Sequence, residues 1–446
     1  MKSRQLFGTD GIRGRAGEAP LDRATAYALG AALGAWAESK ATEPKVLVGM
    51  DTRESGPWLA ESVAAGLAAS GVETHFAGLI STPGVAHNTK VGDYVAGVMI
   101  SASHNPYEDN GLKIFDHSGF KLPDATELML EQEILRIRES VPAFENPLEV
   151  DPEPDQDYLR FLKSTFPDSI AGMKLVVDCA NGAASYLAPE LFSSLGAEVI
   201  AVANQPNGRN INDGVGALHT DHVKAHVLAH GADLGIAFDG DADRAMFISG
   251  EGNLIDGDLV LLIAARRLKS EESLPGHRVV STVMSNLGLE VALEREGITL
   301  ARTSVGDKYV LEEMIRSGNA LGGEQSGHII FSKYSTTGDG MLTALRVLEA
   351  MVTTKKTADQ LCQGFEVFPQ LLVNVRIKGK RPLEELPEVQ AHIAACEAEF
   401  NGKGRVLVRF SGTEPLARVM VEGNDVAKVH HHAHTIAASI ESALGG

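Results

Sequence analysis

The sequence predicts an α/β fold: three related α/β domains, each with a mixed sheet, and a smaller C-terminal α+β domain, arranged around a central cleft. Two observations support this prediction. A plan of short apolar strand, polar turn and helical pattern recurs three times along the chain, and each repeat ends in a polar loop behind its third strand. The length of 446 residues exceeds what one hydrophobic core supports, so several domains are expected.

The three repeats begin with "KVLVGMDTRESG" at 45–56, "KLVVDCANGAAS" at 174–185 and "RVVSTVMSNLG" at 278–288. In each, an apolar strand ends in a turn of Gly, Asp or Asn, and a helical pattern and a second strand follow. The third strands end in "ISASHNP", "FDGDADR" and "GGEQSGH". Open α/β sheets bind their ligands at the carboxyl ends of strands, so these three loops are expected to carry the chemistry.

Domain boundaries are expected where the pattern is interrupted. A segment rich in proline and acid at 139–158 marks the first, and polar turns mark the later ones. The last segment alternates strand and helix patterns, which predicts a small α+β domain. The predicted domains are 1–150, 151–253, 254–366 and 367–446, and each carries one of the four loops discussed below.

The charge balance limits the partners that the chain can bind. Lys and Arg number 40 against 59 Asp and Glu, a net charge of −19, and so acidic a surface repels nucleic acid and anionic membranes. We therefore expect a small-molecule partner, and an anionic one would require a local cluster of basic residues. A homodimer is left open.

Cysteine usage and hydropathy predict the compartment. The 3 cysteines are far apart and form no C-x-x-C pair, which favours a reducing cytoplasm over a disulfide framework. No apolar stretch is long enough to cross a bilayer, and the start "MKSRQLFGTDGIRG" lacks the apolar core of a signal peptide. A cytoplasmic protein is expected.

Three aspartates, Asp239, Asp241 and Asp243, follow the apolar run "LGIAF" at alternate positions. Carboxylates at this spacing in a tight loop can converge on one hard cation, and the small Gly240 and Ala242 permit the bend. A solvated acidic turn is the alternative. Mg²⁺ is the expected ion, because few protein ligands leave coordination positions for water and phosphate.

Ser103 lies in "ISASHNP", directly behind a predicted buried strand. It can be a nucleophile, a cap or a turn residue, and the neighbouring Asn105 and Pro106 favour a turn. A serine hydrolase is disfavoured, because the chain has no G-x-S-x-G and His104, as the immediate neighbour, is poorly placed to be the base. A phosphatase with Asp239 as nucleophile and a non-catalytic sugar-phosphate binder are the remaining alternatives.

Two further loops offer ligand-binding groups. In "RFSGTEP", Arg409 presents a planar fork of donors, and the hydroxyls and backbone N–H groups behind it can surround a phosphate. In "GGEQSGH", a carboxylate, a hydroxyl and an imidazole suit the hydroxyl groups of a sugar. The residues concerned are Ser411, Gly412 and Thr413 in the first loop, and Glu324, Ser326 and His328 in the second.

Four motifs in this order resemble those of the α-D-phosphohexomutase family: Ser-Ala-Ser-His-Asn-Pro, Asp-Gly-Asp-x-Asp-Arg, Glu-x-Ser-Gly-His and Arg-x-Ser-Gly-Thr-Glu-Pro. The resemblance extends over essentially the whole chain. "FGTDGIRG", "VGDKYV" and the glutamine in "GEQSGH" are most similar to bacterial members that act on glucosamine phosphates. Three positions differ from the family: Ala242 replaces the usual glycine, Leu112 an isoleucine and Lys308 an arginine.

The resemblance implies an isomerase, an intramolecular phosphotransferase that interconverts the 6- and 1-phosphates of glucosamine for cell-wall precursor synthesis. Glucose and mannose phosphates are alternative substrates. It also implies that Ser103 is carried as a phosphoserine, which would complete a Mg²⁺ sphere begun by the three aspartates. A hexosamine or glucose 1,6-bisphosphate would then be the intermediate and the activator.

Roles for the other site residues follow from the same resemblance. The phosphate that is not transferred would be held by Arg409 and its loop, and sugar hydroxyls by Glu324 and Ser326. Proton transfer would use Lys113, His328 or His104. The basic residues expected around the transferring phosphate are Arg13, Lys113, Arg244, Lys308 and Arg409.

Overall fold

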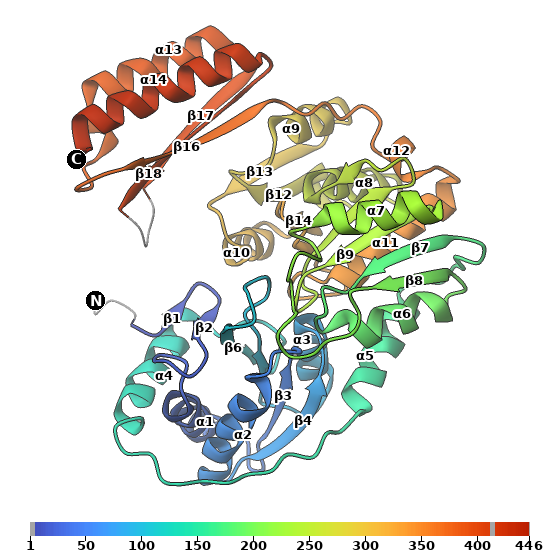
Figure 1. Cartoon of the computed structure of the whole chain (residues 1–446), viewed down its shortest axis with the longest axis vertical. Helices are drawn as coiled ribbons and strands as arrows, with labels where there is room; N and C mark the ends of the chain where they lie inside the picture. The colour runs from blue at the N-terminus through green and yellow to red at the C-terminus, as the bar shows by residue number, and fades with distance from the viewer. Residues whose placement is uncertain (1–4, 411–414, 446) are drawn as a thin grey trace. The chain divides into compact units, whose positions relative to one another are not determined.

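A computed structural model describes residues 5–410 and 415–445 of the chain. The chain forms two compact units. The first comprises Met1–Val283 and Leu300–Gln363, and the second comprises Met284–Thr299 and Gly364–Gly446. Figure 1 shows the elements of both.

Three sheets follow one another along the chain. The first has the order β1 (Phe7–Gly8), β2 (Gly11–Arg15), β6 (Asp109–Asp116), β5 (Ala96–Ile100), β3 (Lys45–Met50) and β4 (Glu73–Leu79). The second has the order β11 (Leu254–Ile255), β10 (Ala245–Ser249), β9 (Leu234–Phe238), β7 (Lys174–Asp178) and β8 (Glu198–Val202). The third has the order β13 (Thr299–Thr303), β12 (Arg278–Thr282), β14 (Leu321–Gly323) and β15 (Ile329–Phe331).

The repeat predicted from the sequence is confirmed by the topology. In each sheet the first strand of the repeat, β3, β7 or β12, lies between the second and the third. The third strand runs parallel to the first, and the next strand, β6, β10 or β15, returns antiparallel beside it. Each polar loop therefore occupies the same place in its sheet, between the third strand and its antiparallel neighbour, and the sheets are mixed as expected.

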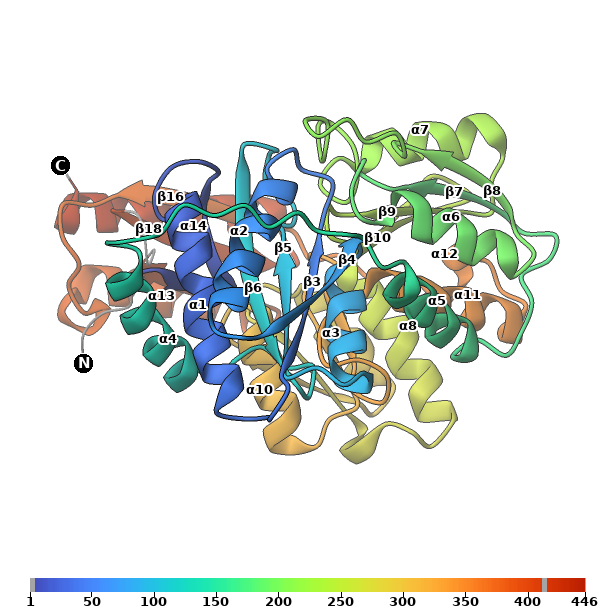
Figure 2. The ribbon, with the colours of Figure 1, turned by 90° about the horizontal axis from the view of Figure 1, so that it is seen from below.

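The first sheet is covered on both faces. Helices α1 (Arg23–Glu38) and α2 (Gly56–Ala69) pack together, and α3 (Thr82–Val91) packs against the sheet as well (Figure 2). Gly30 and Gly66 make the α1–α2 contact possible, because a Cβ on either would lie 2.0 or 2.1 Å from a carbonyl oxygen of the other helix. Successive strand residues alternate between the two faces, so both are apolar and the strands read as continuous hydrophobic runs.

Two of the other helices of the first unit begin at aspartates that cap them. The side chains of Asp256 and Asp339 accept hydrogen bonds from backbone N–H groups at the starts of α8 and α11. The other helices of this unit are α4 (Asp124–Ile137), α5 (Glu153–Ser164), α6 (Ala184–Ser194), α7 (Thr220–His230), α8 (Gly257–Ser270), α10 (Asp307–Ser317), α11 (Gly340–Thr354) and α12 (Ala358–Leu361), with a 3₁₀ turn at Pro275–His277.

The second unit contains a small α+β domain, as predicted for the C-terminal part. Its sheet has the antiparallel order β16 (Gln370–Arg376), β18 (Leu416–Gly423) and β17 (Gly404–Phe410). Helices α13 (Pro387–Phe400) and α14 (Val426–Leu444) cover it and form an apolar core with the strands, while α9 (Leu287–Arg295) and a 3₁₀ turn at Leu383–Glu385 complete the unit.

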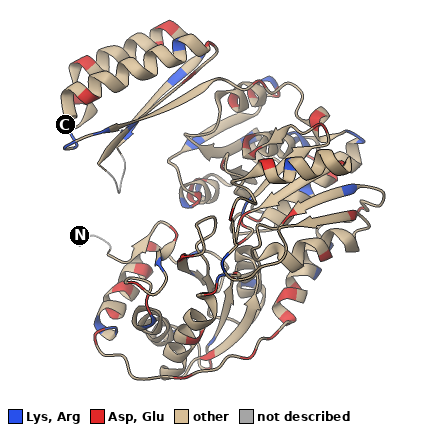
Figure 3. Cartoon of the chain, viewed as in Figure 1, with Lys and Arg blue, Asp and Glu red and all other residues tan. Residues whose placement is uncertain are grey.

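Acidic residues are distributed over helices of both units (Figure 3), in keeping with the net charge of −19. Among the helices in the described part of the chain, none combines the length and the apolar character needed to span a membrane.

Candidate active site

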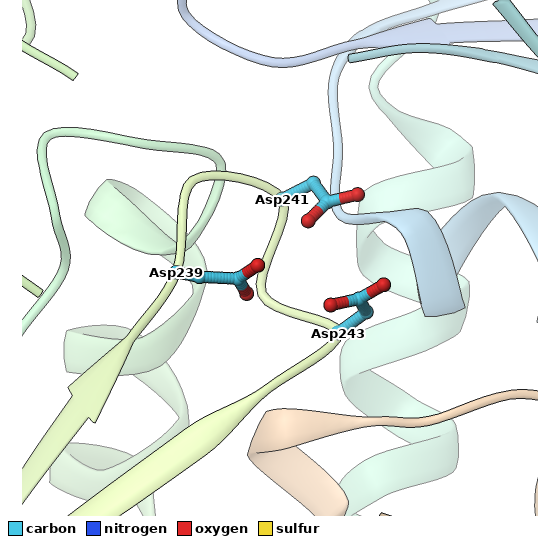
Figure 4. Close-up of side chains that lie close together, drawn as sticks. All are labelled: Asp239, Asp241 and Asp243. Carbon is cyan, nitrogen blue, oxygen red and sulfur yellow. The ribbon is translucent and has the colours of Figure 1, made fainter. Parts of the chain in front are cut away.

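The three aspartates predicted to bind a metal form one cluster on the loop between β9 and β10. One carboxylate oxygen from each of Asp239, Asp241 and Asp243 lies within 4.8 Å of the other two, and all three residues are buried (Figure 4). The loop turns through Ala242, whose φ of +58° is in the left-handed region. That conformation is the physical reason why glycine is the usual residue here, and alanine can adopt it at some cost in strain.

The cluster has the properties of a cation site. Burial, followed by repulsion from Asp243 and Asp241, raises the pKa of Asp239 well above its ordinary value. The Oδ1 atoms of Asp241 and Asp243 are buried and have no hydrogen-bond partner among the described residues. Buried carboxylate oxygens without donors, converging from three side chains, fit a hard divalent cation that would supply the missing positive charge.

Ser103 lies at this cluster, although it belongs to the loop that follows β5. Its Oγ donates a hydrogen bond to Asp239 Oδ2 at 2.6 Å, and the residue is 1% exposed. Its backbone φ is +54°, so a non-glycine residue occupies the left-handed region at this point. His104 Nδ1 lies 3.3 Å from the same Oγ. The serine predicted to carry phosphate and the aspartates predicted to bind metal are therefore in contact.

Asp241 receives two donors from the first sheet and its helices. Lys113 on β6 donates to Asp241 Oδ2 at 2.7 Å, and the Thr82 hydroxyl at the start of α3 donates to the same oxygen at 2.5 Å. The backbone N–H of Thr82 also bonds the Asp241 carbonyl at 3.0 Å. These donors occupy Oδ2 and leave Oδ1 as the oxygen of Asp241 that can face a cation.

Lys113 is surrounded by carboxylates. Besides Asp241, its Nζ lies 3.3 Å from Asp10 Oδ2 and 3.7 Å from Asp243 Oδ2. Burial lowers the pKa of Lys113, but the attraction of Asp10, Asp241 and Asp243 outweighs it and the pKa is raised. Lys113 is an ammonium ion in this arrangement and offers a positive charge or a proton.

His328, which follows β14, faces the same cluster. Its Nδ1 lies 3.6 Å from Asp243 Oδ2, and its Nε2 accepts a hydrogen bond from the Gly338 N–H at 2.9 Å. A nitrogen that accepts carries no proton, so the ring shown is neutral with its proton on Nδ1. Burial lowers the pKa of His328, but Asp243 and then Asp307 raise it above 6.5. These carboxylates therefore favour uptake of a second proton by the ring.

His104 differs from His328 in its surroundings. Burial, and then the positive charges of Arg244 and Arg13, lower the pKa of His104 to about 4. The ring is neutral at physiological pH. Arg244 itself lies beside the cluster, with its Nε 3.8 Å from Asp243 Oδ1, while Arg13 on β2 forms an ion pair with Asp10.

The predicted sugar loop connects β14 and β15. The carboxylate of Glu324 accepts a hydrogen bond from the Gly306 N–H at 3.0 Å, which ties the loop to the turn before α10. Ser326 lies in the same loop and is partly exposed. Lys308, in the first turn of α10, pairs with Asp124 and lines a cavity of about 380 Å³.

Arg409 lies on β17 in the second unit, directly opposite Arg418 on β18. Partial burial, and then the charge of Arg418, lower the pKa of the Arg409 guanidinium. Two adjacent guanidinium groups on one sheet attract an anion. The remaining predicted residues of this loop, Ser411, Gly412 and Thr413, lie outside the described residues.

Several residues at the site were not identified from the sequence. Lys121 Nζ lies 2.5 Å from both Asp10 Oδ1 and Asp307 Oδ2, and so connects the first sheet to α10. Asp10 was visible within "FGTDGIRG", three residues before Arg13, a spacing that could have indicated an ion pair. Thr82 and Lys121 carry no comparable signal, because only the tertiary fold brings them to the aspartates.

Comparison with known proteins gives consistent results. Four domain families described as phosphoglucomutase/phosphomannomutase match in order: α/β/α domain I at 4–141, domain II at 156–252, domain III at 256–368 and the C-terminal domain at 372–439. A phosphoglucosamine mutase of Solibacter usitatus is 56% identical over 445 residues, which cover 99% of this chain and 100% of that protein.

Two solved structures show the same fold. One is a phosphoglucomutase/phosphomannomutase family protein from Burkholderia thailandensis, with a TM-score of 0.80 and 25% identity over 99% of this chain and 98% of that one. The other is the N-acetylphosphoglucosamine mutase of Aspergillus fumigatus in complex with GlcNAc-6P and magnesium, with a TM-score of 0.66 and 19% identity over 98% of this chain and 96% of that one.

Proposed function

Because the chain belongs to the phosphoglucomutase/phosphomannomutase family, we propose that it interconverts glucosamine 6-phosphate and glucosamine 1-phosphate through a phosphoserine at Ser103 and a bisphosphate intermediate. The observation that carries this proposal is the 2.6 Å hydrogen bond between Ser103 Oγ and Asp239 in the aspartate cluster. The names of full-length relatives at 44–56% identity support glucosamine as the sugar.

The first transfer moves the phosphoryl group from the enzyme to the sugar. The free hydroxyl of the sugar phosphate attacks phosphorus, the bond from phosphorus to Ser103 Oγ breaks, and Oγ takes up a proton as the sugar hydroxyl loses one. In the second transfer, the other phosphoryl group of the bisphosphate moves from the sugar to Ser103 Oγ, which loses its proton as the sugar oxygen gains one. Ser103 is then phosphorylated again, and no phosphate is consumed.

Mg²⁺ held by Asp239, Asp241, Asp243 and the phosphorylated Ser103 would neutralise charge on the transferring group. Arg244 and Lys113 contribute fixed positive charge beside the cluster. In this buried setting such charges act more strongly than they would in water, and they are in place before the reaction begins.

Proton transfer requires groups that can serve two alternate sugar hydroxyls. His328 suits this role, because the hydrogen bond accepted by Nε2 assigns its proton to Nδ1 and the nearby carboxylates favour uptake of a second proton. Lys113, an ammonium ion in contact with Asp241, and His104, a neutral ring with a pKa of about 4, are the other candidates.

We assign the substrate contacts according to chemistry. Glu324 and Ser326 would form hydrogen bonds with sugar hydroxyls. Lys308, in the first turn of α10, would contribute positive charge. Arg409 would bind the phosphate that is not being transferred, together with Ser411, Gly412 and Thr413. We further propose that the reaction takes place in the cytoplasm and supplies amino-sugar nucleotide and cell-wall precursor synthesis.

A comparison of substrates tests the proposal. The purified enzyme with Mg²⁺ and a trace of glucose 1,6-bisphosphate is given the 6-phosphates of glucosamine, glucose and mannose in turn, and formation of each 1-phosphate is followed by a coupled assay. We expect the highest kcat/KM for glucosamine 6-phosphate. A higher value for glucose or mannose would change the assigned sugar, and steady release of inorganic phosphate without any 1-phosphate would overturn the mutase.

A further inference from the structure

The backbone of Ser103 is held in a conformation that it would not adopt by itself. A φ of +54° is costly for a residue with a Cβ, and such a conformation persists only where the surroundings impose it. The loop also approaches the aspartates closely, since a Cβ on Gly240 would lie 2.5 Å from the Ser103 carbonyl oxygen. Some group must therefore hold that carbonyl in place.

Arg53, in the turn after β3, is one such group. It is 1% exposed, and its Nη2 donates hydrogen bonds to the carbonyl oxygens of Ser103 at 3.1 Å and of Asn105 at 2.6 Å. Its charge is balanced by the buried Asp51, with which it forms an ion pair. Asp51 also accepts a hydrogen bond from Ser101 Oγ at 2.5 Å. A buried arginine aimed at two carbonyls of one loop is a specific and expensive arrangement.

Asn212, in the long connection after β8, bonds the same two atoms. Its Nδ2 donates to the carbonyl oxygen of Ser103 at 2.9 Å and to that of Asn105 at 3.1 Å. Its own backbone has a φ of +59°, and its N–H bonds the Ala180 carbonyl at 2.9 Å. The serine loop is thus bonded at identical points by residues that follow strands of two different sheets.

We infer that Arg53 and Asn212 are positioning residues, which hold the Ser103 backbone so that Oγ points at Asp239. Two donors on each carbonyl fix both its place and its direction, and the side chain of Ser103 is directed as a consequence. The inference rests on the proposed function, because its value to the protein is the placement of the phosphoryl group for transfer. Neither residue touches the side chain of Ser103 in the contacts described here.

The first test replaces Asn212 by Gly. Glycine adopts a φ of +59° without strain, so Asn212→Gly removes the two hydrogen bonds and leaves the backbone free to keep its path. Asn401→Gly is the matched control: Asn401 caps α13 in the second unit with a φ of +45° and undergoes the same change far along the chain from the serine loop.

We expect Asn212→Gly to lower kcat by about 10-fold or more, since a displacement of roughly 1 Å can cost about 10²-fold. The KM for glucosamine 6-phosphate should stay within about 2-fold, because the sugar contacts are unchanged. Rates are expressed per phosphoserine, and the ³¹P signal of the phosphorylated protein is recorded. That signal should shift in Asn212→Gly and stay at its wild-type position in Asn401→Gly.

Arg53 is tested with two variants, because loss of a buried charge can reduce folding by itself. Arg53→Met leaves Asp51 unpaired, whereas Arg53→Lys keeps the charge and loses the second donor group. If Arg53 positions the serine loop, the unfolding temperature of Arg53→Lys should be close to that of wild type, whereas its kcat per phosphoserine should stay nearer to that of Arg53→Met. If kcat per phosphoserine returned to wild type together with the unfolding temperature, Arg53 would be a structural residue and the inference would be overturned for it.

Failure of this inference can be told from failure of the proposed function. If wild-type enzyme formed no glucosamine 1-phosphate, the proposed function would be wrong. If wild type were active, and Asn212→Gly matched it in kcat per phosphoserine and in ³¹P signal, the mutase would stand and the positioning role of Asn212 would be overturned.

Discussion

The serine–aspartate cluster and the strand pair around Arg409 differ in how far their charged groups are exposed to solvent. Ser103, Asp239 and Asp241 are 0–1% exposed, and the described side chains around them supply donors from several elements. Every residue of β17, by contrast, is partly exposed, and Arg409 lies opposite a second arginine on the neighbouring strand. One region buries the groups that we propose to react, and the other presents a charge that we propose to bind phosphate.

The contrast has an electrostatic cause. Charges removed from water interact strongly and stay where they are placed, which suits a transferring phosphoryl group whose charge distribution changes along the reaction. Charges near the surface attract an anion but are screened by salt and water, which suits reversible binding. We therefore expect substitutions in the buried cluster to act on kcat, and substitutions on the exposed strand to act on KM.

The largest effect is expected for Ser103→Ala, which tests whether the buried region contains the reacting group. Loss of the hydroxyl removes the atom that carries the phosphoryl group, so kcat should fall by at least about 10³-fold, and intact mass should show no phosphate on the protein. Ser164→Ala is the control, because Ser164 lies on the exposed end of α5 and bonds only the Phe161 carbonyl in the contacts described. Full activity of Ser103→Ala would remove the distinction between the two regions.

Asp241→Asn should have the next largest effect. The amide oxygen can still accept from Lys113 and Thr82, which places the NH₂ group where the unpartnered Oδ1 now lies. We expect Mg²⁺ affinity, measured by calorimetry without substrate, and kcat each to fall by about 10²-fold, while the protein stays folded. Asp221→Asn, on the exposed start of α7, is the control. Unchanged Mg²⁺ affinity would show that the cluster is a structural feature.

Arg409→Lys sharpens the comparison from the other side. Lysine keeps the charge but loses the planar fork, so one charge-assisted hydrogen bond to phosphate is lost and KM should rise by about 10-fold. The kcat should change far less, and more bisphosphate should leak into solution per product formed. Arg376→Lys, on the exposed strand β16, should leave KM unchanged. A fall in kcat with constant KM would place Arg409 with the reacting groups.

The smallest effect is expected at His87, a partly buried histidine that has no proposed role in the reaction. Burial, and then Lys90, lower the pKa of His87 on α3 to about 4, where the ring stacks on Phe161 at 3.9 Å. Between pH 6.5 and 4 the imidazole takes up a proton in the unfolded chain but not in the folded protein, so the free energy of unfolding decreases as pH falls through this range. Because the ring is partly exposed, solvent weakens the effect, and we expect this decrease to be about 1 kcal/mol.

The measurement for this last prediction is urea unfolding at pH 7 and pH 5. His87→Phe keeps an aromatic ring that can stack on Phe161 but cannot be protonated. The change in its free energy of unfolding between the two pH values should therefore be smaller than that of wild type by about 1 kcal/mol. Equal pH dependence in the two proteins would show that water reaches the ring of His87, and that its position on α3 does not disfavour the protonated imidazole.

Sequence patterns were sufficient for the parts of this protein that depend on neighbouring residues. The three-fold repeat was predicted from strand and turn patterns, and each predicted loop lies at the same place in its sheet. The convergence of Asp239, Asp241 and Asp243 was predicted from their alternate spacing, because three side chains on one tight loop have little freedom to separate. Local geometry follows from local sequence.

The family resemblance implied that Ser103 meets the three aspartates, but the other distant contacts at the site were decided by the tertiary structure. No spacing indicates that Thr82 and Lys113 share one oxygen of Asp241, or that Lys121 connects Asp10 to Asp307. The pair of donors from Arg53 and Asn212 on the serine loop is of the same kind, since 159 positions separate them. Such contacts depend on how whole sheets pack, and packing is a property of all the buried surfaces together, so no short stretch of sequence contains it.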